Sequence, residues 1–315
     1  MVGVAPSPDH ETTHTPVVAV VGATASGKSA LALALAESLP IGIVNADAMQ
    51  LYRGMDIGTA KPTTAERRRV PHYGLDLLEI SQAASVAQFR QYARTCIAGL
   101  ADQGRLPVVV GGSALYLRAV LDHLDIPPTD PQVRERWNLQ LKLRGSADLH
   151  EELRAVAPQA AAEIDPRNGR RIVRAMEVVE LTGSFTARLP EPVSWRPTLW
   201  LGLRPERADL DIRISQRVEH MWQEGLVAEV ARLQQQGLAH APTASRAVGY
   251  QQVLEFLAGE VTAADAKVNM VAVTKKLARR QERTFRANTR IQWLDSSSDP
   301  QTEALERIAN LPRVE

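Results

Sequence analysis

Residues 22–29 read Gly-Ala-Thr-Ala-Ser-Gly-Lys-Ser, a full match to the pattern G-x-x-x-x-G-K-[ST]. A β-branched apolar run precedes the match at 16–21, and strong helix formers follow it at 30–39. A strand, a glycine loop and a helix in this order form the context in which backbone amides and the lysine bind phosphate, while the final hydroxyl reaches Mg²⁺. The sequence therefore predicts a phosphate-binding loop composed of Gly22, Ala23, Thr24, Ala25, Ser26, Gly27, Lys28 and Ser29.

Strand and helix signals alternate over the N-terminal part of the chain, which is typical of a parallel α/β sheet. Two further apolar runs, at 41–47 and 106–112, lead to Asp47 and to Ser113. Ligands of parallel sheets gather at the carboxyl ends of the strands. We therefore expect Thr24, Asp47 and Ser113 to line one crevice.

The character of the chain changes near Asp122, where an arginine-rich, helix-patterned segment begins after the break at Pro127-Pro128. Helices are predicted there at 132–144, 147–157 and 170–182. A strand signal returns at 198–203. The predicted organisation is a discontinuous α/β core at 16–121 and 199–315, an inserted all-helical domain at 122–198, and a disordered tail at 1–15.

The composition bounds the class of protein. The chain has 315 residues, a formal net charge of +1 and one cysteine, Cys96, which excludes an internal disulfide and is typical of a reducing compartment. No apolar run approaches the roughly 20 residues that span a bilayer, and residues 1–15 lack the apolar segment of a signal peptide. We expect a cytoplasmic protein without membrane association and, since no apolar heptad demands a partner, a monomer.

Positive charge is concentrated in three clusters. Between 267 and 290, eight Lys and Arg residues stand against one acidic residue. Spacings of three and four place five of them on one helix face: Lys275, Arg279, Arg283, Arg286 and Arg290. Such a surplus repels itself unless a polyanion pairs with it, which favours a nucleic-acid substrate. The second cluster contains Arg167, Arg170, Arg171 and Arg174, and the third, Arg67–Arg69, is interpreted as a solvated surface.

Asp47 is the carboxylate best placed to act beside the phosphate loop. In a phosphate-loop enzyme it would be a base or a Mg²⁺ ligand, and the alternative is a helix N-cap. The run at 106–112 ends in glycines, not in the aspartate that an NTP hydrolase would use to hold Mg²⁺. This weakens an ATPase interpretation.

Several further stretches carry a family resemblance. They include Asn-Ala-Asp at 45–47, Tyr-Arg-Gly-Met-Asp-Ile-Gly-Thr-Ala-Lys-Pro at 52–62 and Ser-Arg-Ala-Val-Gly-Tyr at 245–250, together with the phosphate loop, and the stretch at 52–62 is highly specific. With these stretches the chain resembles the tRNA dimethylallyltransferase family from about residue 17 to 295. The resemblance implies transfer of a dimethylallyl group from its diphosphate to N6 of adenosine 37, in tRNAs that read codons beginning with U. It also implies a P-loop NTPase-like sheet core.

The resemblance also implies roles for particular residues. Asp47 would be the base for the N6 proton. Ser113 would be a catalytic residue too: it stands where most members carry threonine and keeps the hydroxyl that would help hold the adenine or Asp47. Lys28, the loop amides, Thr24, Ser29 and Mg²⁺ would hold the diphosphate, with Arg217 as the core arginine and Arg213 as its rival. Residues implied to contact tRNA are Asp47, Ala48, Met49, Gln50, Arg167, Arg170, Arg171, Arg246, Gly249, Tyr250, Gln251, Lys275, Arg279, Arg280, Gln281, Arg283 and Arg286.

Two positions depart from the family pattern. Gln251 stands where the family often has arginine, and Phe285 where tryptophan is common; both are expected to alter RNA contacts more than chemistry. Three alternatives remain open. They are a phosphate-loop nucleotide kinase, an adenylate prenyltransferase of the cytokinin type, and an RNA-binding module with a vestigial loop.

Overall fold

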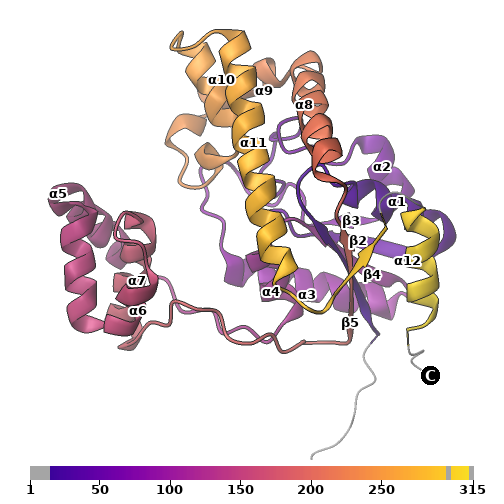
Figure 1. Ribbon diagram of the computed structural model, residues 1–315, viewed down its shortest axis with the longest axis horizontal. Coiled ribbons are helices and arrows are strands. Elements are labelled where there is room, and N and C mark those ends of the chain that lie inside the picture. Colours follow the sequence, from indigo (N-terminus) through magenta and orange to yellow (C-terminus); the bar gives the residue numbers. More distant parts are fainter. Residues whose placement is uncertain (1–14, 296–298, 312–315) are drawn as a thin grey trace, which may run out of the picture. The chain divides into compact units, whose positions relative to one another are not determined.

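The structure, a computed structural model, describes residues 15–295 and 299–311 (Figure 1). The disordered tail predicted for 1–15 thus lies outside the described residues except for its last position. A six-stranded sheet forms the core, in the order β3-β2-β4-β1-β5-β6, with every neighbouring pair parallel. The strands are β1 (Val17–Gly22), β2 (Ile41–Asn45), β3 (His72–Tyr73), β4 (Leu106–Gly111), β5 (Thr198–Leu203) and β6 (Ile291–Leu294). The predicted α/β class with a parallel sheet is confirmed.

Helices make up most of the remaining chain. They are α1 (Lys28–Ser38), α2 (Thr64–Arg69), α3 (Val86–Asp102), α4 (Ala114–Leu121), α5 (Pro131–Val156), α6 (Pro158–Glu163), α7 (Gly169–Thr182), α8 (Arg207–Gln223), α9 (Leu226–Gln235), α10 (Tyr250–Leu257), α11 (Ala263–Arg286) and α12 (Pro300–Ala309). Short 3-10 helices lie at Leu238–His240 and Ala244–Arg246. None of the helices in the described ranges combines the length and apolar character needed to cross a membrane.

The sheet is covered on both faces, because alternate residues of a strand point to opposite sides. Val17, Ala19 and Val21 of β1 pack with α3, α4 and Phe285 of α11. Val18 and Val20 pack with α1 and α12 on the other face. The buried faces explain why the strands read as continuous apolar runs. Because neighbouring strands are parallel, the carboxyl ends of β1, β2 and β4 share one edge of the sheet.

The sequence analysis did not predict two of the strands, β3 and β6. β3 has only two residues, too few for a periodic signal, and β6 follows directly on the basic segment. Both are outermost in the sheet order, where a strand pairs on one side only. The neighbourhood of β6 also corrects the predicted basic helix face, because α11 ends at Arg286 and Arg290 lies outside it. The Arg290 guanidinium instead binds the fully buried Asp122 carboxylate at 2.6 and 3.1 Å.

The segment His123–Val193 forms a compact unit of its own, and the other described residues form a second unit. Its boundaries are slightly narrower than the predicted 122–198, because Asp122 and Ser194 pair as an isolated β-bridge within the core unit. Inside the segment, α5 bends at Gly145, whose φ of 82° lies in the left-handed region, at the predicted break between two helices. Leu149, Leu153 and Ile172 build its apolar core.

Arginines of this unit differ in what they contact. The Glu177 carboxylate, fully buried, accepts hydrogen bonds from Arg134, Arg174 and the Thr129 hydroxyl. Arg174 is therefore a structural residue. Three arginines that were predicted to contact tRNA are exposed: Arg167, which pairs with Asp165; Arg171, which donates to the Ala187 carbonyl; and Arg170, which makes no ion pair within the described part of the chain.

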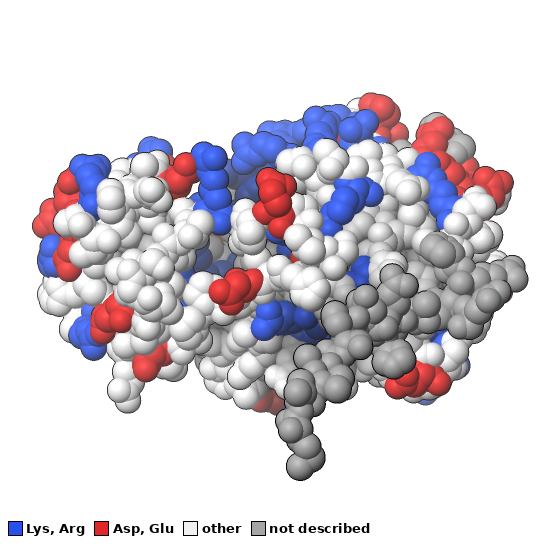
Figure 2. Space-filling model, turned by 90° about the horizontal axis from the view of Figure 1, so that it is seen from below, with Lys and Arg blue, Asp and Glu red and all other residues white. Residues whose placement is uncertain are grey.

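Basic side chains gather in a dense patch along one edge of the molecule in Figure 2, while acidic side chains are scattered. Helix α11 supplies Arg279, Arg280 and Arg283, all exposed and without an ion pair to the residues that the structure describes. We call these three the α11 ridge. The Lys275 ammonium lies 3.7 Å from Asp211, and Arg286 pairs with Glu282 at 2.6 Å. The ridge thus stays free for a polyanion, as does the exposed Lys276, which has no ion pair to the described residues either.

Candidate active site

The phosphate loop joins β1 to α1 in a shape that needs its glycines. Gly22 has φ 151°, and a Cβ there would lie 2.5 Å from the Leu203 carbonyl oxygen. Gly27 has φ 99° and immediately precedes α1. Ala25, with φ 62°, holds a left-handed conformation that costs an L-residue energy. The loop is therefore a strained turn that places the amino end of α1 toward the carboxyl edge of the sheet.

Lys28 is the first residue of α1, and its ammonium donates to the Ala23 carbonyl of the same loop at 2.6 Å. Burial lowers the pKa of Lys28 to about 8; the nearby Asp47 carboxylate opposes this effect, and the Arg217 guanidinium adds to it. The charge of this lysine is therefore sensitive to any anion that enters the loop.

The lowered pKa leads to a pH-dependent prediction. Above pH 8 the uncharged amine prevails in the free protein, whereas a bound diphosphate favours the charged form, so binding must take up a proton. We expect the Kd for inorganic diphosphate to rise with pH above about 8, by up to about tenfold per unit. Isothermal titration between pH 7.5 and 9.5 checks this. Lys28→Met should bind weakly at every pH, and an equal slope in both proteins would contradict the assignment.

Asp47 follows β2 and is held by a local turn. The Asn45 side chain accepts from the Asp47 amide at 3.1 Å and donates to the Gly74 carbonyl at 2.9 Å. Asp47 Oδ1 accepts from the Met49 amide at 2.9 Å, although no helix begins here. The other oxygen has no hydrogen-bond partner among the described residues. The turn therefore fixes the carboxylate while leaving one oxygen able to accept a proton.

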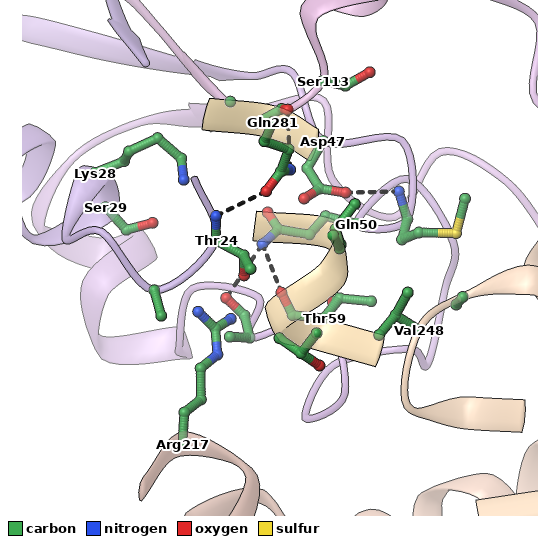
Figure 3. Close-up of a pocket in the computed structure, with 18 of the residues that line it drawn as sticks. Thr24, Lys28, Ser29, Asp47, Gln50, Thr59, Ser113, Arg217, Val248 and Gln281 are labelled. Atoms are coloured by element: carbon green, nitrogen blue, oxygen red, sulfur yellow. Dashed lines mark hydrogen bonds between the residues drawn. The ribbon is translucent and has the colours of Figure 1, made fainter. Parts of the chain in front are cut away.

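A cavity of about 740 Å³ opens at this edge of the sheet (Figure 3). Thr24, Asp47 and Ser113 all line it, so the predicted crevice is confirmed. Lys28 enters from α1 and Arg217 from α8, and Figure 3 shows both on the same side of Asp47 as Thr24 of the phosphate loop. The wall also includes six residues predicted to contact tRNA, namely Ala48, Met49, Gln50, Arg246, Arg280 and Gln281.

Arg217 has a pKa below the usual arginine value because of burial, which the Asp47 carboxylate partly offsets. Its guanidinium makes no hydrogen bond to the described residues. Arg213, one turn earlier on α8, lines the same cavity but is exposed. The structure thus brings both candidate arginines to the site, with Arg217 closer to the phosphate loop and Asp47.

The specific stretch at 52–62 forms a loop whose residues Gly58, Thr59 and Ala60 make another wall of the cavity. Gln50 donates to the carbonyls of Thr59 and Ala60 at 3.0 and 3.2 Å. The fully buried Lys61 ammonium donates to the Tyr52 carbonyl and to the carboxylates of Asp56 and Asp76. Buried polar groups therefore hold this wall in shape.

Sequence reasoning missed Glu229, which anchors the same loop from α9. Its buried carboxylate accepts from the amides of Asp56, Ile57 and Gly58 at 2.8 to 3.2 Å and from the Tyr250 hydroxyl at 2.6 Å. The prediction that Tyr250 contacts tRNA is wrong for its side chain, which is 0% exposed. Gly249 is buried too, with φ 97° beside Met270.

Removing the Glu229 carboxylate leaves three backbone amides and the Tyr250 hydroxyl without a partner. We expect Glu229→Ala to lower the free energy of unfolding by about 3 kcal/mol or more, because each unsatisfied buried group costs roughly 1–3 kcal/mol. Tyr250→Phe removes a single hydrogen bond and should cost about 1 kcal/mol. Urea denaturation compares the two variants. Equal losses would mean that the three amides find other partners.

Two family departures receive a structural account. Phe285 is 2% exposed and packs into the core with β1, so its side chain does not reach the surface on which RNA would bind. Gln251 is exposed and hydrogen-bonds Glu255 on the next turn of α10. It remains on the surface, although it does not line the cavity.

The oxygen atoms that line the site determine whether it can hold the expected Mg²⁺. The Ser29 hydroxyl lines the cavity at the phosphate loop. No group of three His, Cys, Asp or Glu side chains within 15–295 and 299–311 could hold a metal alone. Mg²⁺ binds through few protein oxygens when substrate phosphates and waters supply the rest. The residues present therefore fit a magnesium ion that arrives with a diphosphate.

The fold and the cavity define a phosphate-loop α/β protein with an inserted helical unit. The model of the IPP transferase family matches residues 50–288. The chain is 55% identical to tRNA dimethylallyltransferase of Salinispora tropica over 282 residues, covering 89% of this chain and 88% of that protein. It is 54% identical to tRNA dimethylallyltransferase of Thermobifida fusca, with coverage of 88% and 89%.

A crystal structure leads to the same family. The full-length tRNA isopentenylpyrophosphate transferase of Bacillus halodurans matches with a TM-score of 0.69 and 35% identity, over 94% of this chain and 96% of that one. The chain therefore belongs to the IPP transferase family, and the resemblance predicted from its motifs is confirmed.

Proposed function

We propose that this chain transfers a dimethylallyl group from dimethylallyl diphosphate to N6 of adenosine 37 in tRNAs that read codons beginning with U. The observation that carries the proposal is one cavity in which the Asp47 carboxylate faces Lys28 and Arg217 beside the phosphate loop. Relatives at more than 50% identity are named for dimethylallyl transfer to tRNA. We place the reaction in the cytoplasm and expect the chain to act as a monomer.

The chemistry divides between two sides of the cavity. The N6 lone pair forms a bond to C1 of the dimethylallyl group, while the bond from C1 to the diphosphate oxygen breaks and its electron pair leaves with the diphosphate. An adenine amine is a poor nucleophile, so the free oxygen of Asp47 accepts the N6 proton. Lys28, Arg217 and the loop amides balance the charge that develops on the leaving group.

Magnesium fits this scheme as a substrate-borne ion. The Ser29 hydroxyl would help hold the ion together with the diphosphate, and it would supply positive charge against the charge of the leaving group. The acceptor base must itself reach the cavity, because a base inside an anticodon loop cannot react in place. The nucleotide must turn out of its stack and enter between Asp47–Gln50 and Arg246–Val248.

The α11 ridge supports RNA as the acceptor. Its three exposed arginines would contact phosphates and give affinity without reading sequence. The exposed arginines of the inserted unit, Arg167, Arg170 and Arg171, would do the same from their own surface. A free nucleotide acceptor has no use for either set.

The test is transfer of label from radioactive dimethylallyl diphosphate. It is offered to an anticodon stem-loop with adenosines at positions 36 and 37, to the same stem-loop with guanosine at 37, and to AMP. We expect label on the first RNA alone. Label on AMP would replace the proposal with an adenylate prenyltransferase. Label on no acceptor, with phosphate transfer from ATP instead, would replace it with a kinase.

A further inference from the structure

Both polar atoms of the Gln281 side chain form hydrogen bonds with backbone atoms of the protein itself. Its Oε1 accepts from the Thr24 amide of the phosphate loop at 2.9 Å. Its Nε2 donates to the Gly112 carbonyl, directly before Ser113, at 3.0 Å. One amide group therefore joins α11 to the carboxyl ends of both β1 and β4, as Figure 3 shows for the Thr24 bond.

The packing of α11 explains how Gln281 reaches these loops. Ala278, one turn earlier, is buried against Ala23 of the phosphate loop, and Phe285, one turn later, is buried against the sheet. Spacings of three and four place Gln281 on this inner face. The ridge residues Arg279 and Arg283 lie on the outer face and are exposed. The helix thus separates RNA-facing charge from a polar contact to the catalytic loops.

The absence of a side chain at Gly112 leaves room for the Gln281 amide. A Cβ at this position would lie 2.6 Å from Gln281 Nε2, and the next atoms, Gln281 Cδ and the Gly22 carbonyl oxygen, are 3.4 and 3.5 Å away. The only severe clash is therefore with the end of one flexible side chain. An alanine at 112 would push the Gln281 amide out of its bridge and disturb little else.

We propose that Gln281 is a positioning residue for the transfer reaction and not an RNA contact. It holds Thr24, on the side of the leaving diphosphate, in register with Ser113, on the side of the acceptor. Reacting groups must meet within a few tenths of an ångström, and a misplacement of about 1 Å can cost 100-fold in rate. The inference rests on the proposed function, because it assigns Gln281 a part in that reaction.

The test uses the full chain with Gln281→Ala, Gly112→Ala and the double variant, and Arg283→Ala as the matched change on the outer face of the same helix. Single-turnover prenyl transfer gives the rate at saturation, and fluorescence anisotropy gives the Kd for the stem-loop. Gln281→Ala and Gly112→Ala should each lower the saturated rate about 10- to 100-fold and leave the stem-loop Kd within about twofold.

The double variant should be no slower than Gln281→Ala, because the alanine at 112 then has nothing to displace. Arg283→Ala should show the opposite pattern, with a weaker stem-loop Kd as its main effect. The proposal is overturned if Gln281→Ala weakens RNA binding at an unchanged rate, or if the two alanine changes multiply. Failure of the unaltered chain to transfer label would instead refute the proposed function.

Discussion

Asp47→Asn should lower the turnover of prenyl transfer by about 10²- to 10⁴-fold, the usual contribution of a positioned general base. The asparagine oxygen can still accept from the Met49 amide, and Asn45 still holds the backbone of the turn. Only the ability of the second oxygen to take the N6 proton is lost. The effect should therefore fall on the chemical step.

Two measurements separate this outcome from its rivals. Single-turnover rates at saturating substrates report the chemical step, and stem-loop anisotropy reports binding, which should change less than about threefold. If Asp47 held only the turn, Asp47→Asn would retain nearly full rate. If it were mainly an RNA contact, the loss would appear in the stem-loop Kd and vanish at saturation.

The cavity could be predicted from the sequence because parallel sheets impose a simple rule. Strands that end shortly before Asp47 and shortly before Ser113 bring those residues to one edge beside the phosphate loop, however far apart they are in the chain. The strands themselves were predictable because both faces of the sheet are buried and leave long apolar runs. Only the short outer strands β3 and β6 gave too little pattern.

The anchoring network could not be predicted, because nothing local distinguishes Glu229 from other helix glutamates. Its role depends on α9 packing against a loop more than 170 positions earlier in the chain. The same contact explains the error at Tyr250, since a polar residue in a specific motif suggests a ligand contact until its burial is known. Such motifs mix residues that meet substrate with residues that hold the walls.

The orientation of Gln281 could be predicted from the sequence only in part. Its place beside several arginines suggested RNA binding, but the spacing of Ala278, Gln281 and Phe285 already describes an apolar helix face with one polar member. That pattern favours an inward-pointing glutamine, whereas the neighbouring arginines favour an RNA contact.

Arg217→Gln should lower the saturated rate by about 10²- to 10³-fold, the usual cost of removing one donor to a developing oxyanion. The guanidinium is half-buried in the cavity, burial lowers its pKa, and it makes no hydrogen bond to the described residues. A charge held in this way is available to the leaving diphosphate at no cost of breaking another contact. The loss should therefore exceed that from any exposed arginine.

Arg213→Gln is the matched control, because Arg213 lies one turn earlier on α8 and lines the same cavity while exposed to solvent. Water screens an exposed charge, so this change should cost less than about tenfold. Single-turnover rates and the Kd for dimethylallyl diphosphate decide between the two arginines. If Arg213→Gln were the more damaging change, the diphosphate would lie nearer the mouth of the cavity, and Arg213 would be the residue that stabilises its departure.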